Sequence, residues 1–292
     1  MTPNSKFTGE NLEFWSNIKF LSQKIGYYKK PTPSHPLRGF CVPDVDQIKS
    51  TFLAQKLDYS KLIDPKDALT AYGQKIVDYF TYRKDILNTE VEPNLMDAKQ
   101  AKRLFTKHKA RLTPKCPLPL NKQSGTKKDF AFLTCLVNML IEESIATNNC
   151  DYDPRELTAI TKGNHPVRTL SRRVDGAFPR VINPIAVWEI KEYYYTTTFG
   201  SRIADGVYET MLDGYEVEEI KKNLSIDVKH YLFIDAYSTW WNDGKSYLCR
   251  MVDILNMGLV DEIIIGKEVE TRVPVLVKSW LAELAKRKAA II

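Results

Sequence analysis

The sequence has few cysteines and histidines, and they are widely separated. No two cysteines form a CxxC pair, and the histidines are scattered in the same way. Structural zinc needs closely spaced ligands, and a disulfide framework needs an even set of cysteines, so we expect neither. Reduced thiols in a reducing compartment are the simpler interpretation. The residues concerned are Cys41, Cys116, Cys135, Cys150 and Cys249, with His35, His108, His165 and His230.

Long apolar runs are also missing. No stretch reaches the roughly 18 apolar residues that a membrane-spanning helix needs. The first residues, MTPNSKFTGENLEFW, lack the charged and apolar segments of a secretory signal. No glycine-rich loop with a following Lys-Ser/Thr is found, so nucleotide hydrolysis has no support. We expect a soluble, cytoplasmic protein without a membrane partner.

Positive charge is concentrated in one segment. The chain carries a formal net charge of +6, and residues 99–128 contain ten Lys or Arg and no acidic residue. Such a run attracts a polyanion such as DNA, because each neutralised phosphate releases condensed counterions. We therefore expect Lys127 and Lys128 to contact DNA. A solvated linker is the alternative, and the prolines in the middle of the run suit either interpretation.

Hydrophobic periodicity predicts helices in the first half of the chain and alternating strands and helices in the second. Helices are expected at 11–24, 44–57, 64–87, 96–110, 129–147, 201–223, 244–257 and 275–288. Strands are expected at 170–175, 185–194, 231–236 and 263–265. This order predicts an α/β fold with a central mixed sheet flanked by helices. We expect a mainly helical, basic DNA-binding region over 1–128 and the α/β core over 129–292.

Two acidic residues and a lysine fall in the expected strands. Side chains alternate along a strand, so Glu189 and Lys191 point to the same face, and Asp175 ends the strand before them. Charges inside an apolar strand are costly to bury without a partner or an ion. Paired carboxylates repel each other, and an oxygen-only set suits Mg²⁺. We expect Asp175 and Glu189 to bind Mg²⁺, with Lys191 positioning water or stabilising the phosphorus.

These residues match a known pattern. The segments RVDG (173–176) and VWEIK (187–191) resemble the motif of the PD-(D/E)XK nuclease superfamily and of its type II restriction endonucleases. Val174 stands where the family's name has a proline. The resemblance covers about residues 129–265. It implies a hairpin flanked by helices, on which the two acids bind Mg²⁺ and the lysine is catalytic.

The resemblance also implies a further catalytic acid from the helix that precedes the hairpin. Glu143 is the first candidate and Glu142 the second. The alternative is that Glu189 and Lys191 form an ordinary surface pair, with Asp175 in a turn. The apolar residues IAVW before Glu189 argue against a solvated strand.

Arginines near the motif are candidates for contacts with DNA phosphates. Arg172 and Arg173 precede the first acid, and a counter-ion role for nearby acids is the competing account. Arg202 shares one helix face with Asp205 and Glu209, so this face could lie near the active site or a phosphate. A solvated helix face would show the same spacing.

Together these patterns predict a Mg²⁺-dependent type II restriction endonuclease that cuts double-stranded DNA at a short site. A homodimer is expected, because two-fold DNA sites favour two-fold proteins. One alternative keeps the fold and makes the chain a repair or recombination nuclease that selects DNA structure. The other is a non-catalytic DNA-binding protein that uses the basic run alone.

Overall fold

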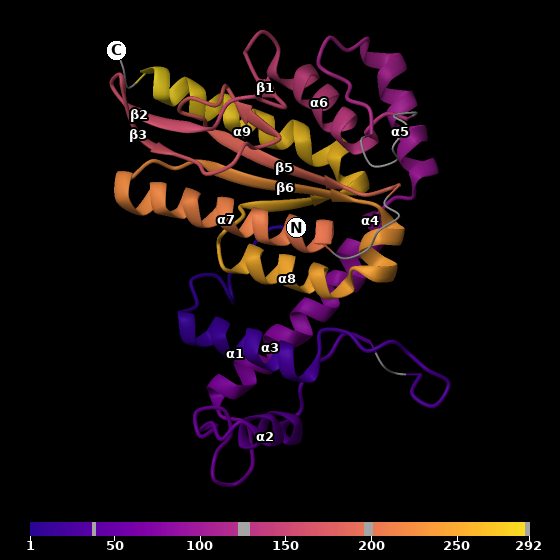
Figure 1. Ribbon diagram of the computed structural model, residues 1–292, viewed down its shortest axis with the longest axis vertical. Coiled ribbons are helices and arrows are strands. Elements are labelled where there is room, and N and C mark those ends of the chain that lie inside the picture. The colour runs from indigo at the N-terminus through magenta and orange to yellow at the C-terminus, as the bar shows by residue number, and fades with distance from the viewer. Residues whose placement is uncertain (37–38, 122–128, 196–200, 290–292) are drawn as a thin grey trace.

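The computed structural model describes residues 1–36, 39–121, 129–195 and 201–289, and only the backbone of residues 201 and 202. Three N-terminal helices lie below an α/β core in Figure 1. They are α1 (Leu12–Ile25), α2 (Val45–Ala54) and α3 (Ala71–Ile86). Asn11 and Asp44 cap the first two, each accepting a hydrogen bond from a backbone N–H of the first turn. Buried side chains such as Phe14, Ile48 and Tyr79 form the common core of the three.

The third helix begins later than the sequence predicts. We expected it to start at Asp64, but that carboxylate accepts hydrogen bonds from the N–H groups of Lys66 (2.8 Å) and Ala68 (3.0 Å) and so closes a turn. Thr70 is the true cap, and its Oγ1 accepts a hydrogen bond from the Gly73 N–H at 3.0 Å. The Asp-Pro pair thus marks a loop rather than a helix start.

A buried ion pair joins the N-terminal helices to the core. Arg83 of α3 is 2 % exposed, and its Nη1 donates to Asp253 Oδ1 at 3.0 Å and Oδ2 at 3.2 Å. Its Nη2 donates to Ser22 Oγ at 3.1 Å, and the Tyr79 hydroxyl donates to Asp253 Oδ1 at 2.7 Å. The charges of this pair balance, and its polar atoms are hydrogen-bonded.

The core has a mixed five-stranded sheet in the order β1-β4-β5-β6-β7. β4 pairs antiparallel with both β1 and β5, and β5, β6 and β7 are parallel. The strands are β1 (Asp151–Tyr152), β4 (Gly176–Phe178), β5 (Ala186–Glu192), β6 (Lys229–Asp235) and β7 (Glu262–Ile265). A separate hairpin is formed by β2 (Ala159–Lys162) and β3 (His165–Thr169). The predicted α/β class with a mixed sheet is confirmed.

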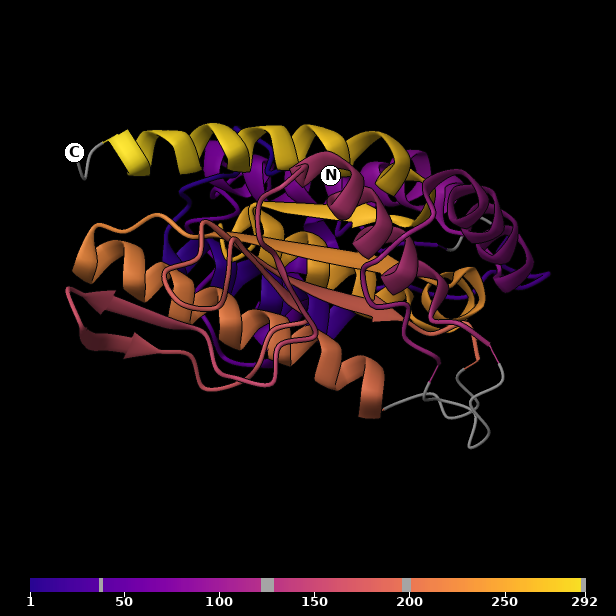
Figure 2. The same cartoon turned by 90° about the horizontal axis from the view of Figure 1, so that it is seen from above.

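Helices cover both faces of the sheet. α6 (Phe132–Ile145) and α9 (Val269–Ala289) lie on one face, and α7 (Ser201–Leu224) and α8 (Lys245–Asn256) lie on the other (Figures 1 and 2). Trp188 and Phe233 pack against the first pair, and Leu232 packs on the side of α8. Val187 packs against α7. Among the described residues, no helix is long and apolar enough to cross a membrane.

The strand expected at 170–175 is not formed. Its backbone is held by α7 instead, because the Ser171 N–H donates to Glu216 Oε2 at 3.0 Å. Leu170 and Val174 are buried, the Leu170 N–H donates to the Thr158 carbonyl at 2.9 Å, and the ladder with β5 has its first residue pair at Gly176 and Trp188. The short strands β1, β2 and β3 were not predicted, because β1 has only two residues and β2 and β3 do not alternate between buried and exposed positions.

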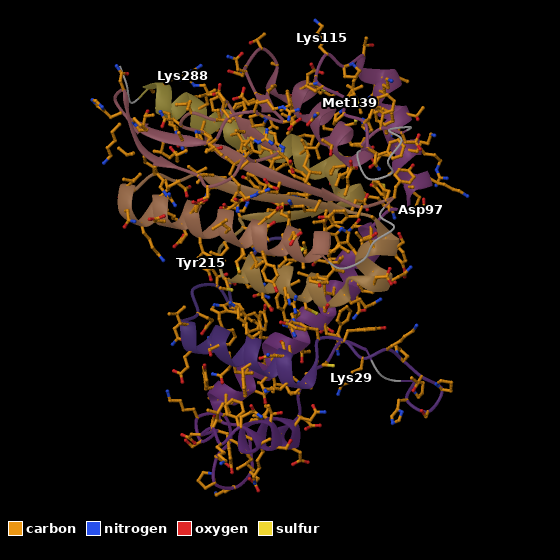
Figure 3. The ribbon with its side chains drawn as sticks, in the orientation of Figure 1. Lys29, Asp97, Lys115, Met139, Tyr215 and Lys288 are labelled. Atoms are coloured by element: carbon orange, nitrogen blue, oxygen red, sulfur yellow. The ribbon has the colours of Figure 1, made fainter. Side chains whose placement is uncertain are left out.

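The basic helix belongs to the core rather than to the N-terminal helices. η1 (Leu87–Val91) and α4 (Glu92–Asn94) lead into α5 (Ala98–Leu112), whose Ala101 and Phe105 pack in the same cluster as α6. Figure 3 shows Asp97 and Lys115 at the core, away from Lys29 of the N-terminal region. The helix α5, which we assigned to the N-terminal region, therefore packs with the α/β core. Shorter elements complete the fold: η2 (Ser238–Asp243) and η3 (Gly266–Glu268).

Candidate active site

The β4–β5 hairpin brings the first acid to the second strand. Asp175 directly precedes β4, and its N–H donates to the Trp188 carbonyl at 3.0 Å. Its side-chain Oδ2 accepts a hydrogen bond from the Ile190 N–H at 2.7 Å. Because Ile190 separates Glu189 from Lys191, the Asp175 carboxylate lies beside the pair that the sequence singles out.

Glu189 and Lys191 point toward α7. Glu189 is fully buried, and Lys191 is 8 % exposed. The Lys191 Nζ lies 2.9 Å from Glu189 Oε2 and 2.7 Å from Glu209 Oε2 of α7. Strand alternation thus places both side chains on one face, and the helix over that face adds a carboxylate.

Arg172 lies among three carboxylates. Its Nη1 is 2.9 Å from Glu189 Oε1 and 2.5 Å from Asp213 Oδ2, and its Nη2 is 3.3 Å from Glu209 Oε2. Four carboxylates therefore surround only two cations, Arg172 and Lys191. The acidic cluster, as we call it, consists of Asp175, Glu189, Glu209, Asp213, Arg172 and Lys191.

Two oxygens of the acidic cluster lack a hydrogen bond in the described part of the chain. They are Glu189 Oε1 and Asp213 Oδ1, and both side chains are 0 % exposed. Arg172 Nη1 is close to Glu189 Oε1 but does not have hydrogen-bond geometry toward it. An unpaired buried oxygen is destabilising, so these two atoms have capacity for a further partner.

Burial and like charges shift the titration of the cluster. Burial, and then the charge of Glu189, raises the pKa of Asp175 to about 7, and the same causes raise the pKa of Asp213 to about 7. Burial opposes ionisation of Glu189 as well, but Lys191 and Arg172 outweigh it and hold the pKa of Glu189 below its usual value. Near neutral pH, Glu189 is therefore ionised while the other two are close to their midpoints.

A cavity of about 320 Å³ lies beside the cluster at the end of β5. Asp175 and Lys191 line it together with Thr134 and Asn138 of α6. Residues of the segment 117–121, which belongs to the basic run, form another part of its wall. The basic run thus reaches the cavity onto which the acid and the lysine open.

The structure does not bring Glu143 to the hairpin. Thr134 near the start of α6 lines the cavity, whereas Glu143 lies in the last turn of that helix. Its two oxygens accept hydrogen bonds from Arg111 at 2.5 and 2.8 Å. Glu142 accepts one from the Lys115 N–H at 3.0 Å. The sequence indicated a helix that reaches the site but not which of its turns does so.

The residues expected to contact DNA have different positions. Arg172 is a counter-ion in the acidic cluster, which favours the alternative that we considered for it. Arg173 is exposed next to it. Arg202 belongs to the first turn of α7, but its side chain lies outside the described part. Lys127 and Lys128 lie outside the described residues.

Asp213 is the member of the cluster that the sequence alone did not single out. It follows Glu209 by four residues on α7, so both side chains lie on one face of the helix. An acidic pair at this spacing, on the helix after the motif strand, was the available signal. Such a pair is equally typical of a solvated helix face, which is why the pattern alone does not identify it.

Fold and cluster define an α/β protein whose mixed sheet gathers acidic side chains, a lysine and an arginine at one hairpin. The chain belongs to a family described as a domain of unknown function (DUF7687), whose model matches residues 96–280. Residues 1–90 match a second family model, also described as a domain of unknown function (DUF7690). Comparisons with curated proteins and with solved structures found no match. The two family models meet where α4 leads into α5.

Proposed function

We propose that the chain is a Mg²⁺-dependent endonuclease with a restriction-endonuclease-like core, which hydrolyses phosphodiester bonds of double-stranded DNA at a short specific site. One observation carries the proposal. The Asp175 carboxylate accepts a hydrogen bond from the amide between Glu189 and Lys191, whose side chains share one face and touch. Two acids and a lysine are thus held at one point of a hairpin, as in the family that the sequence resembles.

The cluster has the chemistry to hold a hard cation. Its carboxylates outnumber its cations, and Glu189 Oε1 and Asp213 Oδ1 are buried without hydrogen bonds. Within the described ranges, no group of three or more Asp, Glu, His or Cys side chains is already arranged around a metal position. Mg²⁺ needs no such cage, since one or two carboxylates, waters and substrate phosphates suffice. Asp175 and Glu189 would hold it.

The chain's own groups have separable roles in this proposal. Bound Mg²⁺ supplies positive charge at a phosphate and lowers the pKa of a coordinated water. Burial works against a charged Lys191, but Glu189 and Asp175 raise the pKa of Lys191 above its usual value. Lys191 therefore stays protonated and donates hydrogen bonds to the phosphate or to the attacking water, rather than acting as a base.

Arg172 neutralises part of the excess negative charge when no cation is bound. Its guanidinium contacts Glu189, Glu209 and Asp213 at the same time. A cation at Glu189 would compete with Arg172 for these oxygens, because both satisfy the same charge. Arg172 would then be free to contact a phosphate. It would thus be a counter-ion of the carboxylates without the cation and a phosphate contact with it.

Double-stranded DNA and a second copy of the chain are the proposed partners. The exposed Lys99 and Arg103 of α5 lie on the basic run whose later residues line the cavity. A duplex that contacts α5 would be guided toward Asp175 and Lys191. Two copies related by a two-fold axis would cut both strands of a symmetric site.

Digestion of a sequenced phage genome tests this proposal. The chain is incubated with the DNA and Mg²⁺, with EDTA in a parallel reaction, and the ends of the fragments are mapped. We expect discrete fragments with ends at one short sequence, which need Mg²⁺ and disappear with the Asp175→Asn variant. The exposed Asp67, paired with Lys49, provides the matched control Asp67→Asn, which should cut like the wild type.

Each other outcome has a defined meaning. Cutting of branched or nicked DNA only would replace site specificity with structure selectivity. Salt-sensitive binding without turnover in Mg²⁺ or Mn²⁺ would contradict an enzyme and leave a DNA-binding protein.

A further inference from the structure

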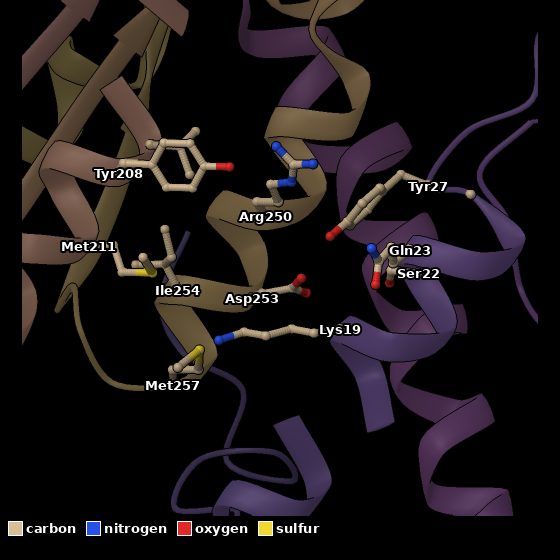
Figure 4. Close-up of a pocket in the computed structure, with 12 residues that line it drawn as sticks. Lys19, Ser22, Gln23, Tyr27, Tyr208, Met211, Arg250, Asp253, Ile254 and Met257 are labelled. Carbon is tan, nitrogen blue, oxygen red and sulfur yellow. The ribbon is translucent and has the colours of Figure 1, made fainter. Parts of the chain in front are cut away.

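A ligand-sized cavity outside the acidic cluster lies where the N-terminal helices meet the core. It has a volume of about 560 Å³ and is lined from α1, α7 and α8 (Figure 4). Small-molecule sites typically enclose roughly 300–1,000 Å³. We call it the junction pocket, and its side chains used below are Lys19, Gln23, Tyr27, Tyr208, Arg250 and Asp253.

Two cations of the junction pocket are not neutralised by ion pairs. Among the described residues, neither Lys19 of α1 nor Arg250 of α8 has a carboxylate in salt-bridge contact. The guanidinium of Arg250 lies against aromatic rings instead, 5.0 Å from the centroid of Tyr27 and 5.1 Å from that of Tyr247. Arg250 also makes a side-chain hydrogen bond with Tyr27, and the remaining guanidinium N–H groups can donate to an anion.

The one carboxylate of the pocket is already balanced. Asp253 accepts both hydrogen bonds from Arg83 and a third from Tyr79. Its negative charge is therefore matched by Arg83, and Lys19 and Arg250 leave the pocket with a net positive charge. An anionic ligand is the complement of such a lining.

Aromatic and apolar side chains form most of the remaining wall. Tyr208 of α7 is 51 % exposed, and in Figure 4 its ring borders the pocket with the hydroxyl toward Arg250. Tyr27 borders it from the side of α1, and Met211 and Met257 add thioethers. Aromatic rings with polarizable sulfur atoms form a surface on which a planar base can stack. Gln23 adds an amide that can both donate and accept hydrogen bonds.

We propose that the junction pocket binds a nucleotide, with its phosphate at Arg250 and Lys19 and its base against Tyr208 and Tyr27. The nucleotide could be a free nucleoside phosphate or a residue of a DNA strand. The second source rests on the proposed nuclease function. Tyr208 is followed by Glu209, whose carboxylate contacts Lys191, so α7 connects the pocket to the acidic cluster.

Calorimetric titration of the full chain with deoxyadenosine 5′-monophosphate and with deoxyadenosine tests the proposal. EDTA and the Asp175→Asn background remove hydrolysis from the measurement. We expect the nucleotide to bind at least about tenfold more tightly than the nucleoside, because charge-assisted hydrogen bonds hold its phosphate. Arg250→Gln should remove that advantage, and Tyr208→Ala should weaken both ligands.

Lys24→Gln is the matched control, because Lys24 is on α1 but its Nζ donates to Gln55 outside the pocket. Nucleotide binding should be unchanged in this variant. A 5′-phosphorylated oligodeoxynucleotide then identifies the source. If it binds more tightly than the mononucleotide and depends on Arg250, the ligand is a DNA strand; if it does not compete, the ligand is a free nucleotide.

The proposal is overturned if neither probe binds, or if Arg250→Gln and Tyr208→Ala both bind like the wild type. Circular dichroism shows whether each variant is folded, and half-exposed Tyr208 can be truncated without opening the core. Because no cleavage is measured, this result is independent of the nuclease test. A nuclease with an empty junction pocket and a nucleotide-binding protein without cleavage are distinct outcomes.

Discussion

Two buried arginine–carboxylate clusters of this chain differ in their charge balance. Arg83 faces one carboxylate, Asp253, and hydrogen bonds involving Tyr79 and Ser22 complete both groups. The acidic cluster around Arg172 has four carboxylates for two cations and two oxygens without hydrogen bonds. A balanced pair suffices to connect two parts of a fold. Excess negative charge and buried oxygens without hydrogen bonds are the features on which the proposed cation site depends.

The largest effect is expected where the balanced pair is broken. Arg83→Met leaves Asp253 buried without its counter-ion, which should lower the free energy of unfolding by about 3–5 kcal/mol. Urea denaturation at pH 7 measures the change. The neighbouring Lys84, whose side chain is 41 % exposed, gives the control Lys84→Met, which should leave the midpoint near that of the wild type. A loss for Arg83→Met below about 1 kcal/mol would contradict a connecting role for this pair.

Removing a negative charge from the acidic cluster should raise the free energy of unfolding, whereas breaking the Arg83–Asp253 pair lowers it. The pKa of Asp213 is raised to about 7, so its ionisation destabilises the folded state relative to the unfolded one. The stabilising contribution of its proton is complete below the unfolded pKa, near 3.9, and is lost as the pH rises toward 7. Asp213→Asn should therefore be more stable than the wild type by about 1–2 kcal/mol at pH 8.

The same change from Asp to Asn at Asp253 of the balanced pair is the comparison for Asp213→Asn. Asp253→Asn should destabilise, because it leaves Arg83 without a counter-ion. Thermal denaturation at pH 4 and pH 8 shows whether each variant unfolds at a higher or a lower midpoint than the wild type. If Asp213→Asn lowers the midpoint at pH 8 as much as Asp253→Asn does, the two clusters do not differ in the way described.

Cation binding should depend on pH. Asp175 has a pKa raised to about 7 and must lose its proton to bind a metal. Ca²⁺ affinity, measured by calorimetry without DNA, should rise about tenfold per pH unit below pH 7 and level off above it. The Asp175→Asn variant should show weak binding without this slope. Equal affinity at pH 5.5 and pH 8 would contradict the assigned ligand.

The smallest effect is expected at Glu143. Its pair with Arg111 is exposed on the surface, and such pairs contribute little to stability. Glu143→Gln should leave the unfolding midpoint unchanged and any Mg²⁺-dependent cleavage rate within about twofold of the wild type. A large loss of cleavage by a folded variant would return this residue to the active site that the sequence suggested.

The fold class and the hairpin were predictable because both depend on local patterns. Strand alternation alone places Glu189 and Lys191 on one face, and alternating strands and helices indicate the mixed sheet. The prediction of a strand at 170–175 was wrong because of a contact with a residue distant in the sequence. The Ser171 N–H is taken by Glu216, a residue of a helix far along the chain, and no local pattern shows such a contact.

The composition of the cluster was predictable only in part. Asp175, Glu189 and Lys191 carry a motif, whereas Asp213 joins through the packing of α7 on β5. The prediction that Glu143 joins the active site was wrong. Helical periodicity shows which face of a helix carries a residue, but not which turn of the helix lies beside the end of a strand. The counter-ion position of Arg172 depends on the same packing of α7.

The cleavage rates of matched variants test the central claim most directly. Plasmid DNA is incubated with Mg²⁺ and wild type, Asp175→Asn or Lys191→Gln, each shown to be folded. If the acidic cluster performs phosphodiester hydrolysis, the wild type cuts and both variants are slower by at least about 100-fold. Folded variants that cut DNA as fast as the wild type would contradict the assignment of this cluster as the active site.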